Sequence, residues 1–164
     1  MRLLARRFRT PIALAATVLV TMVMLVATPP SASAAVRPAT RPAPTLGTRA
    51  LAVARHQIGK PYRWGAAGPW AFDCSGLTQY SYARVGRRLP HNALAQYRSV
   101  RHVRLSQLRP GDLVFMNMSG GGPGGISHVG IYAGHGNWVV ARMPGTRITI
   151  QHIWTHRGVY AGRP

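Results

Sequence analysis

Helix-forming patterns come first along this chain and strand-forming patterns come later, and this order constrains its fold more than any other feature. Residues 48–58 and 74–85 have the apolar spacing of helices, and residues 92–97 could form a third, short helix. From residue 112 on, short apolar segments are separated by Gly- and Pro-rich turns. The expected strands are 112–116, 128–133, 137–141, 146–153 and 159–160. We therefore predict one α+β domain, with N-terminal helices packed on an antiparallel sheet.

The N-terminal segment has the composition of an export signal rather than of a folded domain. Four arginines lie among the first nine residues, an apolar run covers residues 12–27, and Ala32-Ser33-Ala34 has the small residues of a cleavage site. The run of 16 residues is shorter than the roughly 20 that a membrane-spanning helix needs. We predict a signal peptide over residues 1–34 that is cleaved, with an uncleaved anchor as the alternative, and hence a secreted or cell-wall-associated protein.

Two further segments follow the signal. Residues 35–47 are rich in Pro, Ala, Arg and Thr, and we interpret them as an extended linker. Residues 48–164 form the folded domain, and a chain of about this length can bury a core without disulfides or metal ions. The sequence indicates no metal site and no cofactor, and we expect a monomer.

The charge balance limits both the chemistry and the partners. The formal net charge is +19, and it is +15 without the four arginines of residues 1–34. Asp73 and Asp112 are the only acidic residues, so hydrolysis by paired carboxylates and a carboxylate cage for calcium or magnesium are nearly excluded. A protein this basic is attracted to anionic wall polymers or to a membrane surface. No basic helix or stacked-aromatic motif supports nucleic acid as a partner.

The only cysteine lies in the segment Phe72-Asp73-Cys74-Ser75-Gly76, where a Gly- and Pro-rich loop meets an expected helix. One cysteine cannot form an internal disulfide, so Cys74 is an intermolecular disulfide partner, a reactive thiol or a buried inert residue. At a helix start, backbone N–H groups and the helix dipole stabilise a thiolate. This position favours a nucleophile.

A nucleophilic cysteine needs a base, and His128 is the best candidate among the seven histidines. His128 begins an apolar strand and follows a glycine-rich loop, and a strand holds a side chain more rigidly than a loop does. A helix packed against a sheet would bring Cys74 and His128 together. The alternative is a histidine on the surface or in the core that has no catalytic role.

Five short motifs occur in the same order as in one known family. They are Tyr62-Arg63-Trp64-Gly65, Phe72-Asp73-Cys74-Ser75-Gly76-Leu77, Leu89-Pro90-His91, Arg109-Pro110-Gly111-Asp112-Leu113-Val114-Phe115 and Ser127-His128-Val129-Gly130-Ile131-Tyr132. From about Leu51 to Ile153 the chain thus resembles the NlpC-type family of bacterial cell-wall cysteine peptidases. The resemblance implies a papain-like fold with the nucleophilic cysteine at a helix N-terminus. It also implies hydrolysis of amide bonds in peptidoglycan stem peptides, commonly between D-glutamate and the diamino acid.

The resemblance assigns a role to each matching residue. Cys74 would be the nucleophile, His128 the base, and backbone N–H groups around Cys74 would receive the oxyanion. Asp73 matches the position that helps to hold the free amino end of the substrate, and its alternative role is the N-cap of the following helix. Ser75 and Tyr62 would line the same substrate subsite.

The chain departs from the family pattern behind the base. The family usually has a third polar residue, often histidine, twelve residues after the base, and here that residue is Val140. Valine cannot accept a hydrogen bond from the imidazole ring. The residues left to orient His128 are His135, Asn137, Gln151 and His152, besides a backbone carbonyl. Two hypotheses follow: an active peptidase with a different orienting group, or a wall-binding relative with little or no activity.

Overall fold

The computed structural model describes residues 43–155 and 157–164, which belong to one compact unit. The predicted signal peptide and most of the predicted linker lie outside the described residues. Three helices come first, as expected: α1 (Leu46–Arg55), α2 (Cys74–Ala83) and α3 (Ala93–Ser99). In the part of the chain that is described, no helix is both long and apolar enough to cross a bilayer.

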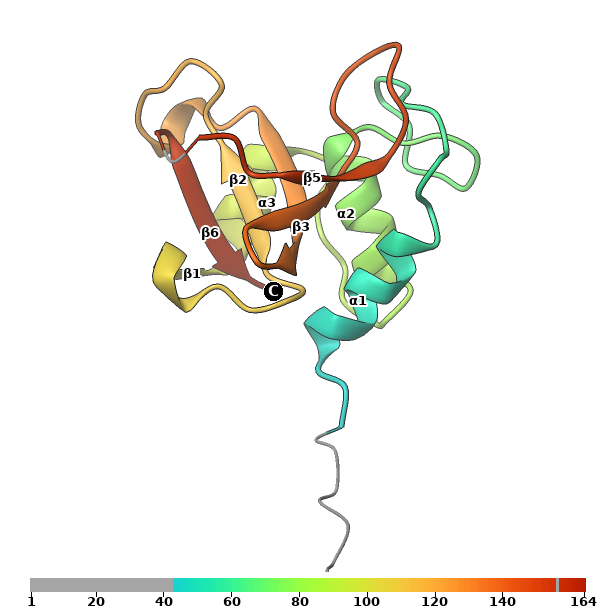
Figure 1. Ribbon diagram of the computed structural model, residues 1–164, viewed down its shortest axis with the longest axis horizontal. Coiled ribbons are helices and arrows are strands. Elements are labelled where there is room, and N and C mark those ends of the chain that lie inside the picture. The colour runs from blue at the N-terminus through green and yellow to red at the C-terminus, as the bar shows by residue number, and fades with distance from the viewer. Residues whose placement is uncertain (1–42, 156) are drawn as a thin grey trace, which may run out of the picture. The chain divides into compact units, whose positions relative to one another are not determined.

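A six-stranded antiparallel sheet follows the helices in the order β1-β6-β2-β3-β4-β5 (Figure 1). Its strands are β1 (Arg101–Val103), β2 (Leu113–Met116), β3 (His128–Gly134), β4 (Asn137–Val140), β5 (Thr149–His152) and β6 (Val159–Arg163). Two short 3-10 helices, Leu105–Gln107 and Pro123–Gly125, lie in the connections. The predicted α+β order is confirmed, and β1 is an additional strand.

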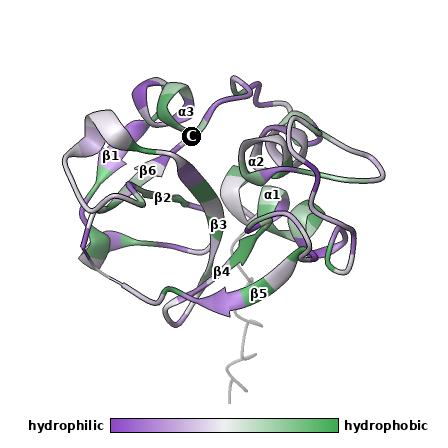
Figure 2. Cartoon of the chain, turned by 90° about the horizontal axis from the view of Figure 1, so that it is seen from above, coloured by the Kyte–Doolittle hydropathy of each residue, from purple (hydrophilic) through white to green (hydrophobic). Residues whose placement is uncertain are grey.

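The sheet buries apolar side chains on both faces. All four residues of β2 are buried, and they alternate between two clusters. Leu113 and Phe115 pack with the helices, whereas Val114 and Met116 pack on the opposite face with Trp138. Apolar residues run along β3 and β4 where these strands lie beside α1 and α2 (Figure 2). Since the strands are held on both faces, side chains at the start of β3 have fixed positions.

Polar side chains define the starts of all three helices. Thr45, Asp73 and Asn92 each adopt an extended backbone and accept a hydrogen bond from the backbone N–H three residues later. Such caps satisfy N–H groups that have no partner within the helix and fix where it begins. The cap at Asp73 makes Cys74 the first residue of α2.

Candidate active site

Cys74 lies where the start of α2 meets β3. Its side chain is buried, and the backbone N–H groups of Cys74, Ser75 and Val129 act to lower the pKa of its thiol. Val129 directly follows His128 on β3, so the structure brings the predicted nucleophile to the strand position next to the predicted base. Backbone N–H groups at a helix start can also stabilise the oxyanion that develops on the carbonyl oxygen of a substrate during acyl transfer.

The thiol differs from the sequence-based expectation in one respect. Burial, and then the negative charge of Asp73, raise the pKa of Cys74, and the backbone N–H groups oppose this only in part. The helix start therefore supplies the expected stabilising donors, but desolvation of the charged form outweighs them. We infer that the resting group at neutral pH is the thiol.

His128 is the first residue of β3, opposite Met116 on β2, and only 6% of it is exposed. Burial, followed by the positive charge of Arg142, lowers its pKa from 6.5 to about 4. The imidazole stands edge-on to Trp138, with ring centroids 5.5 Å apart and an interplanar angle of 83°. At neutral pH the ring is uncharged, which is the form that can accept a proton from a thiol.

The group expected to orient His128 is missing from the described residues. Nε2 of His128 is buried and has no hydrogen-bond partner in residues 43–155 and 157–164. Val140 is fully buried in the apolar cluster with Trp138, and it cannot supply one. Nε2 therefore has no bond to any of the four polar candidates, which are His135, Asn137, Gln151 and His152. The imidazole instead has an edge-on contact with Trp138.

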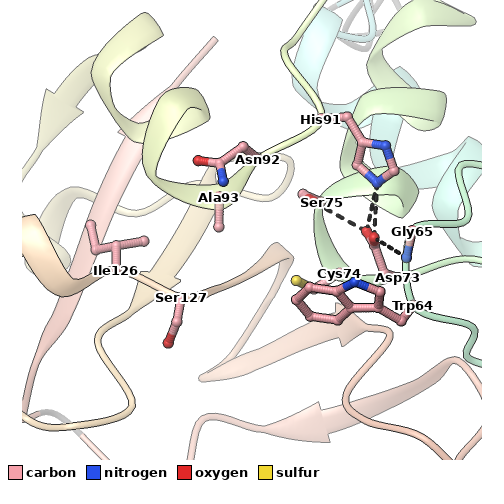
Figure 3. Close-up of a pocket in the computed structure, with 10 residues that line it drawn as sticks. All are labelled: Trp64, Gly65, Asp73, Cys74, Ser75, His91, Asn92, Ala93, Ile126 and Ser127. Atoms are coloured by element: carbon pink, nitrogen blue, oxygen red, sulfur yellow. Dashed lines mark hydrogen bonds and ion pairs between the residues drawn. The ribbon is translucent and has the colours of Figure 1, made fainter.

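Asp73 is the most heavily hydrogen-bonded side chain near Cys74 (Figure 3). Oδ1 accepts from the backbone N–H of Gly76 at 2.7 Å and from the hydroxyl of Ser75 at 3.1 Å. Oδ2 accepts from the backbone N–H of Gly65 at 2.9 Å. Nε2 of His91 lies 2.9 Å from both oxygens. Asp73 is thus the N-cap of α2, one of the two roles that the sequence left open.

A pocket of about 420 Å³ opens beside Cys74 (Figure 3). Its walls include Trp64, Asp73 and Ser75 on one side, and Ile126 and Ser127 on the other. Trp64 is 82% exposed, so this wall remains accessible to a large ligand. The pocket is large enough for a peptide segment, and the only thiol of the chain lies in its wall.

Gly76 lets the loop before α2 pack directly on the helix. A Cβ at this position would collide with the backbone of Ala66, whose carbonyl accepts the N–H of Asp73 at 2.8 Å. The glycine of the Cys-Ser-Gly motif is therefore required by a backbone contact, and this contact holds the wall of the pocket in place.

Tyr62 and His91 complete the surroundings of Cys74. Burial, and then the negative charges of Cys74 and Asp73, raise the pKa of Tyr62. The phenol of Tyr62 therefore lies near these two residues, but Tyr62 does not line the pocket. His91 lines the pocket and binds Asp73, although sequence reasoning assigned it no role. The available signal was its place in the Leu-Pro-His motif just before the cap residue Asn92.

Comparison with known proteins decides the family. The model of the NlpC/P60 family matches residues 59–162, which is more than half of the chain. The chain belongs to the NlpC/P60 family. The motifs from which the resemblance was predicted lie within or close to this match, and the expected papain-like α+β fold, with Cys74 at the start of α2, is confirmed.

Curated relatives of this NlpC/P60 chain are larger proteins. A probable endopeptidase p60 of Listeria monocytogenes is 45% identical over 97 residues, covering 59% of this chain and 19% of the relative. A probable endopeptidase of Corynebacterium glutamicum is 45% identical over 116 residues, covering 68% and 53%. The chain thus spans about a fifth of the first relative and about half of the second.

Solved structures give the same family. The NlpC/p60 domain of the peptidoglycan hydrolase SagA is 34% identical, with a TM-score of 0.65 over 72% of this chain and 98% of that domain. A structure of RipA mutated at a cysteine is 35% identical, with a TM-score of 0.64 over 72% of this chain and 61% of that chain. RipA has also been solved with a mutated histidine and a mutated glutamate, which lie twelve residues apart in that protein.

The buried neutral His128 should make folding stability depend on pH. The pKa of His128 is about 4 in the folded state, whereas the ordinary value of 6.5 applies in the unfolded state. Below pH 6.5 the unfolded state therefore binds a proton that the folded state does not. The contribution of the neutral His128 to the free energy of unfolding is fully present above pH 6.5 and is lost as the pH drops toward 4. On acidification from about pH 7.5 to about pH 4.5, His128 should lower the free energy of unfolding by about 2 kcal/mol.

Urea unfolding of the wild type and of His128→Gln measures this effect, because glutamine stays neutral at both pH values. The wild type should lose about 2 kcal/mol more than the variant on acidification. Equal losses in the two proteins would contradict a buried neutral imidazole.

Proposed function

We propose that this chain is a secreted or wall-associated cysteine peptidase that hydrolyses amide bonds in peptidoglycan stem peptides. Cys74 acts as the nucleophile and His128 as the base. The observation that carries the proposal is the position of Cys74, at the first residue of α2 and in the wall of a pocket, where α2 packs against the strand β3 that begins with His128. The relatives and structural neighbours named as endopeptidases and as a peptidoglycan hydrolase support the same substrate class.

The resting protonation states define the first step. With a thiol and a neutral imidazole, His128 takes the thiol proton as the sulfur attacks the carbonyl carbon. The new C–S bond pushes the carbonyl electrons onto oxygen, and backbone N–H groups near Cys74 stabilise this oxyanion. The C–N bond then breaks, and the leaving amine takes the proton from His128. Water, deprotonated by His128, hydrolyses the resulting thioester and restores the thiol.

The proposed bond is the amide between D-glutamate and the diamino acid, as the family resemblance implies. Tyr62 and Ser75 are proposed to form the subsite beside the nucleophile, and their proximity to Cys74 supports this assignment. The hydroxyl of Ser75 is already bonded to Asp73, so its contribution is to shape this wall of the pocket. The net charge of +15 that remains without residues 1–34 supports association with anionic wall polymers.

A second candidate function is wall binding without catalysis, and the unpartnered Nε2 of His128 favours it. In two separate structures of RipA a histidine and a glutamate were mutated, and the glutamate lies twelve residues after the histidine. In this chain the residue twelve positions after His128 is Val140. A base without a polar orienting group samples more ring orientations, which lowers the rate. Edge-on packing against the buried Trp138 restricts the orientation of the His128 ring without a hydrogen bond, and this contact supports the proposed enzymatic function.

Digestion of purified peptidoglycan tests the function. Because Cys74 is the only cysteine, iodoacetamide provides a control that alkylates a single thiol in the same folded protein. The untreated protein should release stem-peptide fragments with new amino termini at the diamino acid, identified by mass. The alkylated protein should release none. Equal release of fragments by both samples would remove Cys74 from the mechanism, and wall binding without fragments from either sample would establish the non-catalytic alternative.

A further inference from the structure

Both carboxylate side chains of this protein are already occupied by its own donors. The sequence contains only Asp73 and Asp112 as acidic residues. Asp112 accepts from Nε and Nη2 of Arg163 at 2.6 Å each, and from the backbone N–H of Arg109 at 2.8 Å. Asp112 is also nearly buried, and it does not line the pocket beside Cys74. Any carboxylate offered to a substrate in this pocket must therefore come from Asp73.

Asp73 has no acceptor capacity left. Its two oxygens together offer about four lone-pair positions, and four groups donate to them: the backbone N–H groups of Gly65 and Gly76, the hydroxyl of Ser75 and Nε2 of His91. An ionised carboxylate can only accept, so His91 is the donor in its bond. Only 8% of the Asp73 side chain is exposed, against 30% for His91. A substrate group approaching Asp73 from solvent meets His91 first.

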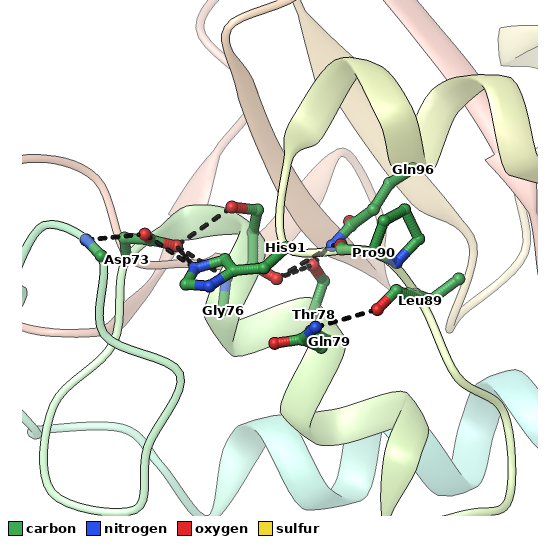
Figure 4. A network of polar contacts seen from close by, with 10 residues as sticks. Asp73, Gly76, Thr78, Gln79, Leu89, Pro90, His91 and Gln96 are labelled. Carbon is green, nitrogen blue, oxygen red and sulfur yellow. Dashed lines mark hydrogen bonds and ion pairs between the residues drawn. The ribbon is translucent and has the colours of Figure 1, made fainter.

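The segment that carries His91 is anchored by the side-chain amides of two glutamines (Figure 4). Gln96 of α3 is fully buried and donates to the carbonyl of Pro90 at 2.8 Å and to the carbonyl of Ser75 at 2.9 Å. Gln79 of α2 donates to the carbonyl of Leu89 at 3.0 Å. These bonds fix the residues before His91 on the same helix that Asp73 caps. The fold thus holds His91 over the carboxylate as a permanent partner rather than as a surface side chain that happens to be near.

We propose that His91 is a specificity-determining residue that closes Asp73 to a substrate ammonium group. The substrate class is then a stem peptide whose first amine is acylated, as it is when the stem is attached to the glycan, and a peptide with a free amino terminus is discriminated against. A free ammonium would enter a pocket of a strongly basic protein, lose water and find no free carboxylate. This inference rests on the proposed function and replaces the family-based role of Asp73 as a ligand of the free amine.

Binding to a variant that cannot cleave separates this inference from catalysis. Two synthetic stem peptides that differ only in N-acetylation are titrated by calorimetry into Cys74→Ala. The acetylated peptide should bind at least about tenfold more tightly, since burying an ammonium without a partner costs more than about 1.4 kcal/mol. In Cys74→Ala/His91→Ala, Asp73 is uncovered, and this preference should fall at least about fivefold. His91→Gln in the same background keeps an N–H donor and should keep the preference.

Three outcomes would overturn the inference: tighter binding of the free-amine peptide, a preference unchanged by His91→Ala, or no detectable binding of the acetylated peptide. Hydrolysis by the protein with Cys74 intact is measured on the same two peptides. If neither is cleaved although the binding preference follows His91, the proposed function fails while the specificity assignment stands. If both are cleaved and the free-amine peptide is preferred, the proposed function stands and the role of His91 fails.

Discussion

Replacing His128 with alanine is expected to lower kcat/KM on stem peptides by about 10²–10⁴-fold, the range typical of a lost general base. The effect should be large because burial raises the pKa of Cys74, so the thiol depends on a neighbouring base to lose its proton. It should lie in kcat more than in KM, because His128 does not line the pocket in which the peptide would bind. Steady-state hydrolysis of a synthetic stem peptide measures both constants.

His56→Ala is the matched control for this prediction. His56 follows α1, is exposed to solvent and does not line the pocket beside Cys74. Its loss should leave kcat/KM within about twofold of the wild type, because surface substitutions of this kind change little. Similar losses in both variants would indicate a general effect on folding, and unchanged activity in His128→Ala would remove His128 from the mechanism.

The order of elements was predictable from sequence because it depends on local periodicity. The hairpin β3–β4 is an example, since Gly134-His135-Gly136 separates two apolar segments and is the turn observed. Strand β1 was not predicted, because Arg101-His102-Val103 is mostly exposed and has no apolar alternation. It exists because it pairs with β6, which lies more than fifty residues later. Pairing over such a distance leaves no local signal in the sequence.

The candidate site was predictable in part for the same reason. Cys74 at a helix start and His128 at a strand start follow from local patterns. The raised pKa of the thiol does not, because it depends on how deeply the folded chain buries Cys74 and on the charge of Asp73. The bond between His91 and Asp73 also required the structure, because the buried amide of Gln96 sets the position of the His91 segment.

From Val140 we expected another polar group to orient His128, and in the part of the chain that is described no group bonds its Nε2. An imidazole with a buried, unpartnered nitrogen is held neutral by desolvation, and its pKa falls to about 4. A neutral base at the start of the strand that packs against α2 is suited to take a proton from the thiol during attack. The ring also packs edge-on against Trp138, which is fully buried. The missing hydrogen bond therefore alters the base without removing it.

Replacing Cys74 with alanine should have the largest effect of all, because it removes the atom that forms the thioester. Cys74 is the first residue of α2, and alanine is a good helix former, so the variant should fold as the wild type does. Circular dichroism and the urea midpoint check this before activity is compared. The nucleophile of a catalytic unit typically accounts for several orders of magnitude in rate.

The most direct measurement is the hydrolysis of one N-acetylated stem peptide by the wild type and by Cys74→Ala at equal concentration, with the products identified by mass. If the protein is a cysteine peptidase, the wild type should release the fragment that begins with the diamino acid. The Cys74→Ala variant should release this fragment at a rate lower by at least about 10³-fold. Release of the same fragment at similar rates by both folded proteins would contradict catalysis by Cys74.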